Sequence, residues 1–76
     1  MTIRDRIAAA ATVVRRQGGD PQQVHLRPVD AIQLQYELLA EGGEVGHAIM
    51  QGGIGKAVSR ICGLQIVWKS AQFSVV

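Results

Sequence analysis

Three Gly-Gly pairs, at positions 18–19, 42–43 and 52–53, divide this chain of 76 residues into short segments. Each pair stands where a helical pattern of apolar residues stops, which is a common place for glycine at the C-terminal end of a helix. The unequal spacing of the pairs argues against an internal repeat. A chain of this length forms one domain (residues 1–76), near the smallest size at which a single core suffices.

The segments between the glycine pairs have helical patterns. Three helices are predicted, over residues 3–17, 28–41 and 44–51. At the start of the first, Thr2 followed three residues later by Asp5 is typical of a helix N-cap. In the second, Pro28 suits the first helical position, and a broad stripe of apolar residues then runs as far as Gly42.

The last sixteen residues contain the only clear alternation of apolar and polar side chains. The alternating apolar residues form two runs: Leu64, Ile66 and Trp68 in the first, and Phe73 and Val75 in the second. A polar break at 69–72 separates the runs, so the pattern predicts a β-hairpin over 64–76. A two-stranded hairpin is only marginally stable by itself. We therefore expect it to lie on helices or to be extended by a strand of another chain.

Together these elements predict an α+β fold in which two to three helices pack on a C-terminal β-hairpin. We expect one face of the hairpin, with Trp68, to contact apolar residues of the two main helices: Ile7, Val14, Ile32, Leu34, Leu38 and Leu39. The outer strand, Phe73 to Val76, remains for contact with a partner.

The composition provides no covalent cross-link that could stabilise so small a domain. Cys62 is the only cysteine, so no internal disulfide can form. It stands next to a strand, where we expect a buried small apolar residue. The additional stability should therefore come from self-association or from docking on a larger protein. No apolar run has the length needed to span a membrane.

Three patterns that could carry chemistry are each incomplete. The glycine-rich segment 52–56 lacks both the first glycine of a phosphate-binding loop and the hydroxyl residue that should follow its lysine. Glu44 and His47 lie one helical turn apart, as in di-iron carboxylate bundles, but the chain has only one such pair. His25, His47 and Cys62 lack the spacing of metal ligands. The sequence therefore predicts a protein that is not an enzyme, with no catalytic residue, cofactor, metal or small-molecule substrate.

Charge is segregated along the chain. The net charge is +3 over residues 1–17, −4 over 18–51 and +3 over 52–76. Such segregation can give complementary patches between neighbouring copies. The alternative is scattered, solvated charge on a small surface.

Basic side chains in the first helix invite a second hypothesis. Arg4, Arg15 and Arg16 fall near one face of this helix, where they could follow the phosphates of a nucleic acid. No helix-turn-helix spacing or aromatic RNA-binding platform accompanies them, and the acidic second helix would repel a duplex. A solvated helix face or contact with a protein is therefore preferred.

The second half has a recognisable order of segments. A Leu-Arg-Pro-Val-Asp run (26–30) opens a helix that ends in Glu-Leu-Leu (37–39). A glycine-rich joint follows, and then the two apolar segments 61–67 and 73–76. This order resembles small proteins encoded by tailed bacteriophages and prophages, minor virion components among them. Such chains commonly have Ser or Thr before the helix-opening proline, where this one has Arg27. The resemblance implies a setting in the virion or in the cytoplasm of a bacterial host, and it identifies no functional residue.

The sequence thus predicts a small non-enzymatic structural or accessory protein, phage-encoded, that forms a homo-oligomer or docks on a larger protein. The expected contact residues are Arg4, Arg15, Arg16, Phe73, Val75 and Val76. The alternative is a small regulator that binds nucleic acid or a host protein through the basic N-terminal helix. No membrane partner is expected.

Overall fold

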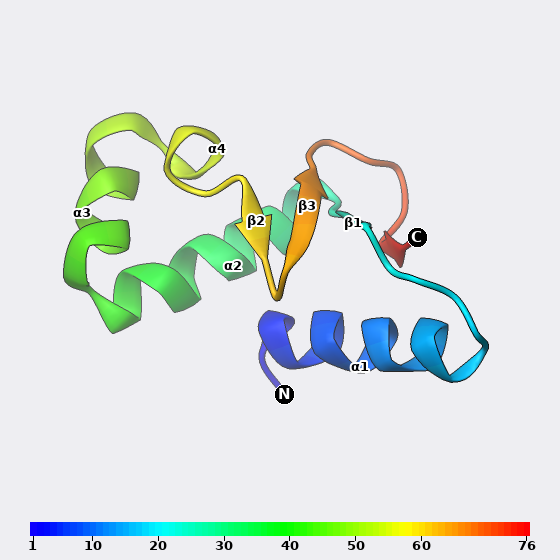
Figure 1. Cartoon of the computed structure of the whole chain (residues 1–76). Helices are drawn as coiled ribbons and strands as arrows, with labels where there is room; N and C mark the ends of the chain where they lie inside the picture. The colour runs from blue at the N-terminus through cyan, green and yellow to red at the C-terminus, as the bar shows by residue number, and fades with distance from the viewer.

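A computed structural model describes all 76 residues and contains four helices and four short strands (Figure 1). In chain order these elements are α1 (Ile3–Arg16), β1 (Gln23–His25), α2 (Pro28–Glu41), α3 (Gly43–Gly52), α4 (Ile54–Ala57), β2 (Arg60–Ile61), β3 (Leu64–Val67) and β4 (Ser74–Val75). The predicted α+β class is confirmed. Helices stand at the three predicted places, and a sheet of four strands takes the place of the expected two-stranded hairpin.

The four strands form one sheet in the order β2-β3-β1-β4. Strand β1 lies in the middle, parallel to β3 on one side and antiparallel to β4 on the other. The predicted β-hairpin over 64–76 is therefore wrong, because β3 and β4 are not neighbours. Alternation indicates which side chains of a strand face the core, but it does not say which strand lies alongside.

A hairpin does form one step earlier in the chain, where β2 pairs antiparallel with β3. Its turn is Cys62-Gly63, and both residues have positive φ angles, 52° and 78°. Two successive left-handed residues are the mark of a type I′ turn, whose twist matches that of a two-residue hairpin. Cys62 is exposed at this turn, so the expectation that it is buried is wrong.

Helix α1 is fixed at its start by a complete capping box. The Thr2 hydroxyl accepts a hydrogen bond from the Asp5 N–H at 3.1 Å, and the Asp5 carboxylate accepts one from the Thr2 N–H at 3.2 Å. Ile3, Ile7 and Ala11, spaced four residues apart, are its buried side chains. A single narrow face of α1 therefore packs on the rest of the molecule.

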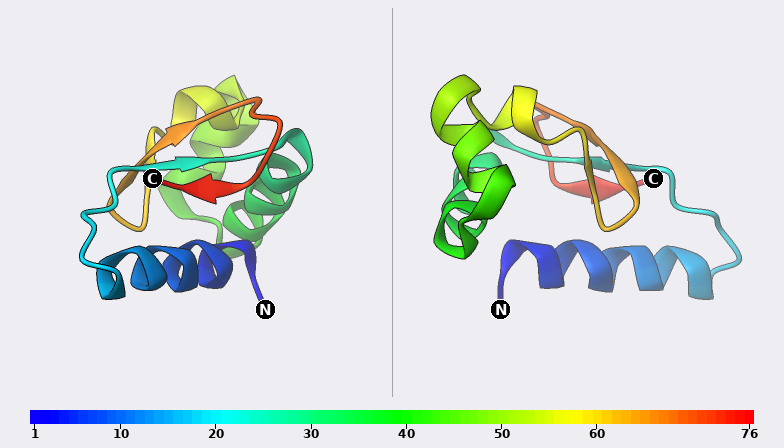
Figure 2. Two further views of the ribbon diagram at one scale, coloured as in Figure 1. Left: turned by 90° about the vertical axis from the view of Figure 1, so that its right-hand side faces the viewer. Right: turned by 60° about the vertical axis from the view of Figure 1, so that its left-hand side comes forward.

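The sheet has a covered face and a polar face. In the parallel register, Val24 lies beside Ile66, and Gln23 lies beside Gln65. Val24 and Ile66 are buried in one cluster with Ile3 and Ile7 of α1, and α1 runs beneath the sheet (Figure 2). Gln65 is exposed on the opposite face.

The core lies between α1, α2 and the covered face of the sheet, and it extends to Ile49 of α3 and to Val58. Its buried apolar residues are Ile3, Ile7, Ala11, Val24, Leu26, Leu34, Leu38, Ile49, Val58, Leu64 and Ile66, with Leu39, Trp68, Phe73 and Val75 partly buried against them. Two predicted core residues lie elsewhere. Val14 is only half-buried, beside Gly19, and Ile32 is 54% exposed. Ile32 lies on the side of α2 opposite Leu34, because residues two apart in a helix point about 200° apart.

Candidate functional site

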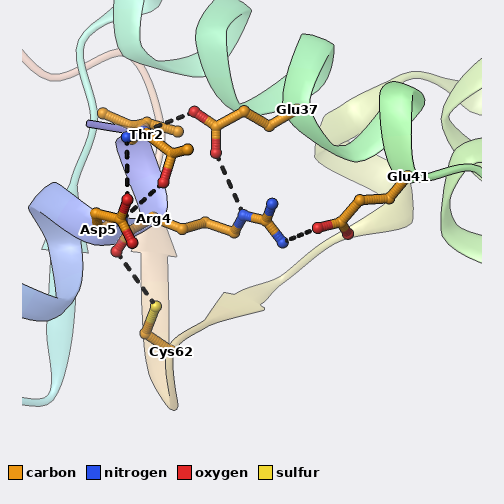
Figure 3. A network of polar contacts seen from close by, with 7 residues as sticks. Thr2, Arg4, Asp5, Glu37, Glu41 and Cys62 are labelled. Atoms are coloured by element: carbon orange, nitrogen blue, oxygen red, sulfur yellow. Dashed lines mark hydrogen bonds and ion pairs between the residues drawn. The ribbon is translucent and has the colours of Figure 1, made fainter.

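Arg4, the first of the predicted contact residues, is engaged inside the molecule (Figure 3). Its guanidinium lies 3.2 Å from a carboxylate oxygen of Glu37 and 2.5 Å from one of Glu41, both on α2. Hydrogen bonding to Glu41 and to Glu37 raises the pKa of Arg4. The backbone N–H of Ile3 donates to the same Glu37 carboxylate at 2.6 Å. Arg4 therefore ties α1 to α2 and is not a free cation for a partner.

Arg15 and Arg16 are exposed in the last turn of α1 and form no ion pair. Positive charge at the C-terminal end of a helix interacts favourably with the helix dipole. Eleven residues separate Arg4 from Arg15, which is about 17 Å along the helix axis at 1.5 Å per residue. The three predicted arginines therefore do not form one patch.

The predicted contact residues near the C-terminus line an edge of the sheet. Val76 and Gln23 exchange two backbone hydrogen bonds of 2.9 Å, so Val75 directs its own N–H and C=O away from β1, toward the open edge. The Phe73 ring is half-buried beneath the Arg6 guanidinium, 4.9 Å from the ring centroid. Val75 packs against the core, and Val76 is exposed. This edge is accessible, but β4 has only two residues.

Asp30 is the only charged side chain in the core, and it is 1% exposed. Its carboxylate accepts hydrogen bonds from the Arg27 guanidinium at 2.9 and 3.0 Å and from the Arg27 backbone N–H at 3.0 Å. Arg6 lies 3.8 Å away. Hydrogen bonding from the Arg27 side chain lowers the pKa of Asp30. Arg27 has no acceptor of its own to cap α2, so Asp30 does the capping and its role is structural.

The other polar side chains singled out in the sequence are dispersed. The His25 imidazole lies 3.3 Å from the side-chain oxygen of Gln23, and His47 is exposed on α3. The Cys62 thiol lies 3.8 Å from the backbone carbonyl oxygen of Arg4. No three of the His, Cys, Asp and Glu side chains gather as a metal site would require. None of the helices combines the length and the apolar character needed to cross a bilayer.

Helix α2 carries more large, exposed apolar side chains than any other element. Val29 is 56% exposed, Ile32 54% and Tyr36 69%, and Ala40 is exposed one turn further on. These four residues, called here the α2 outer surface, lie opposite the buried face formed by Asp30, Leu34 and Leu38. Gln33 is exposed beside them, and no charged residue interrupts them.

A groove of about 320 Å³ adjoins this surface. Its lining comes from the N-terminal half of α2, from α4 and from the end of β3: Pro28, Ala31, Ile32, Ile54, Gly55, Trp68 and Lys69. Ile32 belongs to both the outer surface and the groove. Trp68 is half-buried there, so one part of its side chain completes the core and another lines the groove.

Lys69 has a φ of 59° at the rim of this groove. A left-handed backbone is unfavourable for a residue with a Cβ atom. The Ser70 N–H donates to the Leu26 carbonyl at 3.0 Å, which anchors the strained turn. Lys69 is the only ionisable side chain of the lining.

A second hollow, of about 350 Å³, lies between α3 and β2 and includes Leu38, Val45 and Arg60. It shares no lining residue with the groove or with the α2 outer surface.

The α2 outer surface was not among the predicted contact residues, although the sequence contains its signal. The apolar stripe of the predicted second helix is broad. Leu34 and Ile32 point about 200° apart on this helix, so they cannot both face one core. Comparison of the chain with models of protein families, with curated proteins and with solved structures found no match.

Proposed function

We propose that this protein is a non-enzymatic interaction protein that docks on another protein surface through the α2 outer surface and the groove beside it. The observation that carries the proposal is the exposure of Tyr36, Ile32 and Val29 on one uninterrupted, uncharged helix face. Apolar patches of a few hundred Å² on a small monomer are often functional.

The residue types of this surface are those found at the centre of protein interfaces. Charged residues are depleted there, and tyrosine and tryptophan are enriched among the residues that dominate binding. Tyr36 leaves more than half of an aromatic side chain, about 150–250 Å² in full, in water. Trp68 presents a second aromatic side chain in the groove. Burial of these groups would supply binding free energy with little polar desolvation.

The groove suits a side chain better than a polar metabolite. Six of its seven lining residues carry no charge, and no pair of titratable groups faces into it. Small-molecule sites combine an apolar lining with several convergent polar groups that fix the orientation of the ligand. An apolar side chain of a partner requires no such groups.

The setting that accompanies this proposal is a structural or accessory role in phage assembly, in the virion or in the cytoplasm of a bacterial host. It rests on the resemblance of segments 26–30, 37–39 and 61–76 to small phage-encoded proteins. A marginally stable domain with an apolar helix face suits an assembly in which that face is covered.

A photo-crosslinking residue at position 36 tests the docking surface. Tyr36 is replaced by p-benzoylphenylalanine in cells that express the gene naturally, and Val13, which is 51% exposed on α1, is replaced in the control. We expect a discrete crosslinked product from position 36 that is absent from position 13 and is lost when Ile32→Glu is added. Equal products from both positions, or none from position 36, would refute the proposal.

A further inference from the structure

We propose that the partner surface is α2 of a second copy of this chain, packed antiparallel across a twofold axis near the middle of the helix. This inference rests on the proposed docking function and names its occupant. It commits to one arrangement, in which each copy contributes the same face and every contact occurs twice.

The spacing of the exposed residues suits such a pair. The α2 outer surface extends from Val29 to Ala40, about 17 Å along a helix that rises 1.5 Å per residue. Antiparallel pairing about the turn of Leu34 places Ile32 opposite Tyr36 of the second copy. Val29 then lies within one residue, about 1.5 Å along the axis, of Ala40 of the second copy, so the bulky side chains meet in one layer and a smaller pair in the next.

The groove then receives an aromatic ring. Ile32 lines both the outer surface and the groove, so Tyr36 of the second copy, which faces Ile32, lies at the groove beside Trp68. An aromatic ring with its hydroxyl directed to the rim suits an apolar hollow that opens to water. The same insertion occurs in the other direction, because the axis relates the two grooves.

The charges favour a second copy in this orientation. None of the four residues of the outer surface is charged, so pairing this surface with itself brings no like charges together. Lys69 lies at the N-terminal end of α2, and the exposed Glu44 follows its C-terminal end. Antiparallel packing brings Lys69 toward Glu44 of the second copy at both ends. Parallel packing would set like charges against each other, which disfavours that alternative.

The size of the surface sets the strength to be expected. Four side chains and a groove on each copy make an interface below about 1,200 Å² in total, which is typical of weak association. We therefore expect a reversible dimer that forms at about 10 μM to 1 mM protein and dissociates on dilution.

Sedimentation equilibrium over that concentration range tests the inference. The wild-type mass should rise from monomer to dimer. Tyr36→Glu should raise the dimer Kd at least about 30-fold, because a central aromatic contact is lost twice. Val13→Glu, a change of the same kind on the exposed side of α1, should leave the Kd unchanged. Circular dichroism shows whether each variant is folded.

A charge swap tests the antiparallel orientation without touching the apolar residues. Lys69→Glu and Glu44→Lys, each alone, should weaken the dimer severalfold, and the double variant should restore it. Both side chains are exposed, so these variants keep the fold even if Tyr36→Glu does not.

The outcomes separate this inference from the docking function. A wild-type monomer at 1 mM, or a dimer insensitive to Tyr36→Glu and to both charge reversals, overturns the second copy as occupant. If position 36 nevertheless crosslinks specifically to a different protein, only the self-pairing fails. A monomer without any specific crosslink at position 36 overturns both.

Discussion

Helices α1 and α2 have the same length, 14 residues, and distribute their chemistry in opposite ways. Helix α1 buries three apolar side chains and places charged residues such as Arg15 and Arg16 in water. Helix α2 buries the carboxylate of Asp30 and leaves Ile32 and Tyr36 exposed. The exposed side of α1 carries charged residues, as expected of a helix that faces water in a monomer. Helix α2 has apolar residues on its exposed side as well as on its buried side.

The difference between the two helices follows from the ion pairs that join them. Arg4 and Arg6 of α1 reach the carboxylates of Glu37, Glu41 and Asp30 on α2. The acidic side chains of α2 are thereby drawn toward α1, and only uncharged residues remain for its far side. The outer surface of α2 is apolar as a consequence of the same contacts that hold the two helices together.

The largest expected difference in the free energy of unfolding is between variants on the two faces of α2. Leu34→Ala should lower the free energy of unfolding by about 2–5 kcal/mol, because Leu34 is fully buried. A domain of this size has only about 4–11 kcal/mol in total, so this variant is close to unfolding. Tyr36→Ala should change the stability of the monomer by less than about 0.5 kcal/mol. Urea unfolding at low protein concentration, followed by circular dichroism, measures both; equal losses would contradict the assignment of the two faces.

The next largest difference in the free energy of unfolding is expected between variants at the starts of α2 and α1. Asp30→Asn should lower the free energy of unfolding at pH 7 by about 1.5–3 kcal/mol, the range for charge-assisted hydrogen bonds. The pKa of Asp30 is lowered from 3.8 in the folded protein, so its contribution is present above about pH 4 and is lost as pH falls through the folded pKa.

The matched control is Asp5→Asn at the exposed start of α1. The pKa of Asp5 is also lowered, by hydrogen bonds from the Thr2 backbone and side chain, but its carboxylate is in water. We expect a smaller loss and a weaker pH dependence, as measured by urea unfolding between pH 2 and pH 7. A larger effect at Asp5 than at Asp30 would reverse the comparison.

The helices could be predicted from the sequence because their signals are local. Thr2 with Asp5, and Pro28 at the start of the second helix, lie within a few residues of what they determine. The pairing of strands is not local: Gln23 lies beside Gln65, 42 positions away. Strand β1 has only three residues, and their pattern does not indicate that it lies between the two apolar runs, 64–68 and 73–75, that were predicted to pair.

The candidate site escaped prediction for a different reason. The broad apolar stripe of α2 was visible, but which half faces the core depends on where the carboxylates of Asp30 and Glu37 find their partners. Their partners on α1, Arg6 and Arg4, lie 24 and 33 positions away in the sequence and could not be assigned from spacing alone. The sequence pattern therefore predicts Ile32 in the core and predicts exposed contact residues in α1 and near β4.

A smaller effect concerns the turn between β2 and β3. Cys62→Asn should raise the free energy of unfolding by about 0.5–1 kcal/mol, because asparagine adopts the left-handed backbone of Cys62 more readily than other side chains do. Cys62→Ala, which keeps a Cβ atom without that compensation, should bring no gain. Thermal unfolding measures both, and a destabilised asparagine variant would contradict the type I′ assignment.

The smallest effect on association is expected from the outer side of α1. Changing Arg15 and Arg16 together to glutamine should leave the dimer Kd unchanged and cost stability only through the helix dipole, about 0.3–1 kcal/mol for each residue. The same variant tests the competing nucleic-acid hypothesis in a DNA-binding titration at low and high salt. Salt-sensitive binding by the wild type that is lost in this variant, with Tyr36→Glu binding normally, would favour that hypothesis.

The claim that a second copy of the chain covers the outer surface of α2 can be tested most directly with Trp68. It is the only tryptophan and lines the groove, so its emission reports whether water reaches the groove. On dilution from about 1 mM to about 1 μM, below the concentrations at which so small an interface holds, the wild-type emission should shift to the red. The emission of Tyr36→Glu should already be red-shifted at 1 mM and should not change. A wild-type spectrum that is independent of concentration and identical to that of Tyr36→Glu would contradict coverage by a second copy.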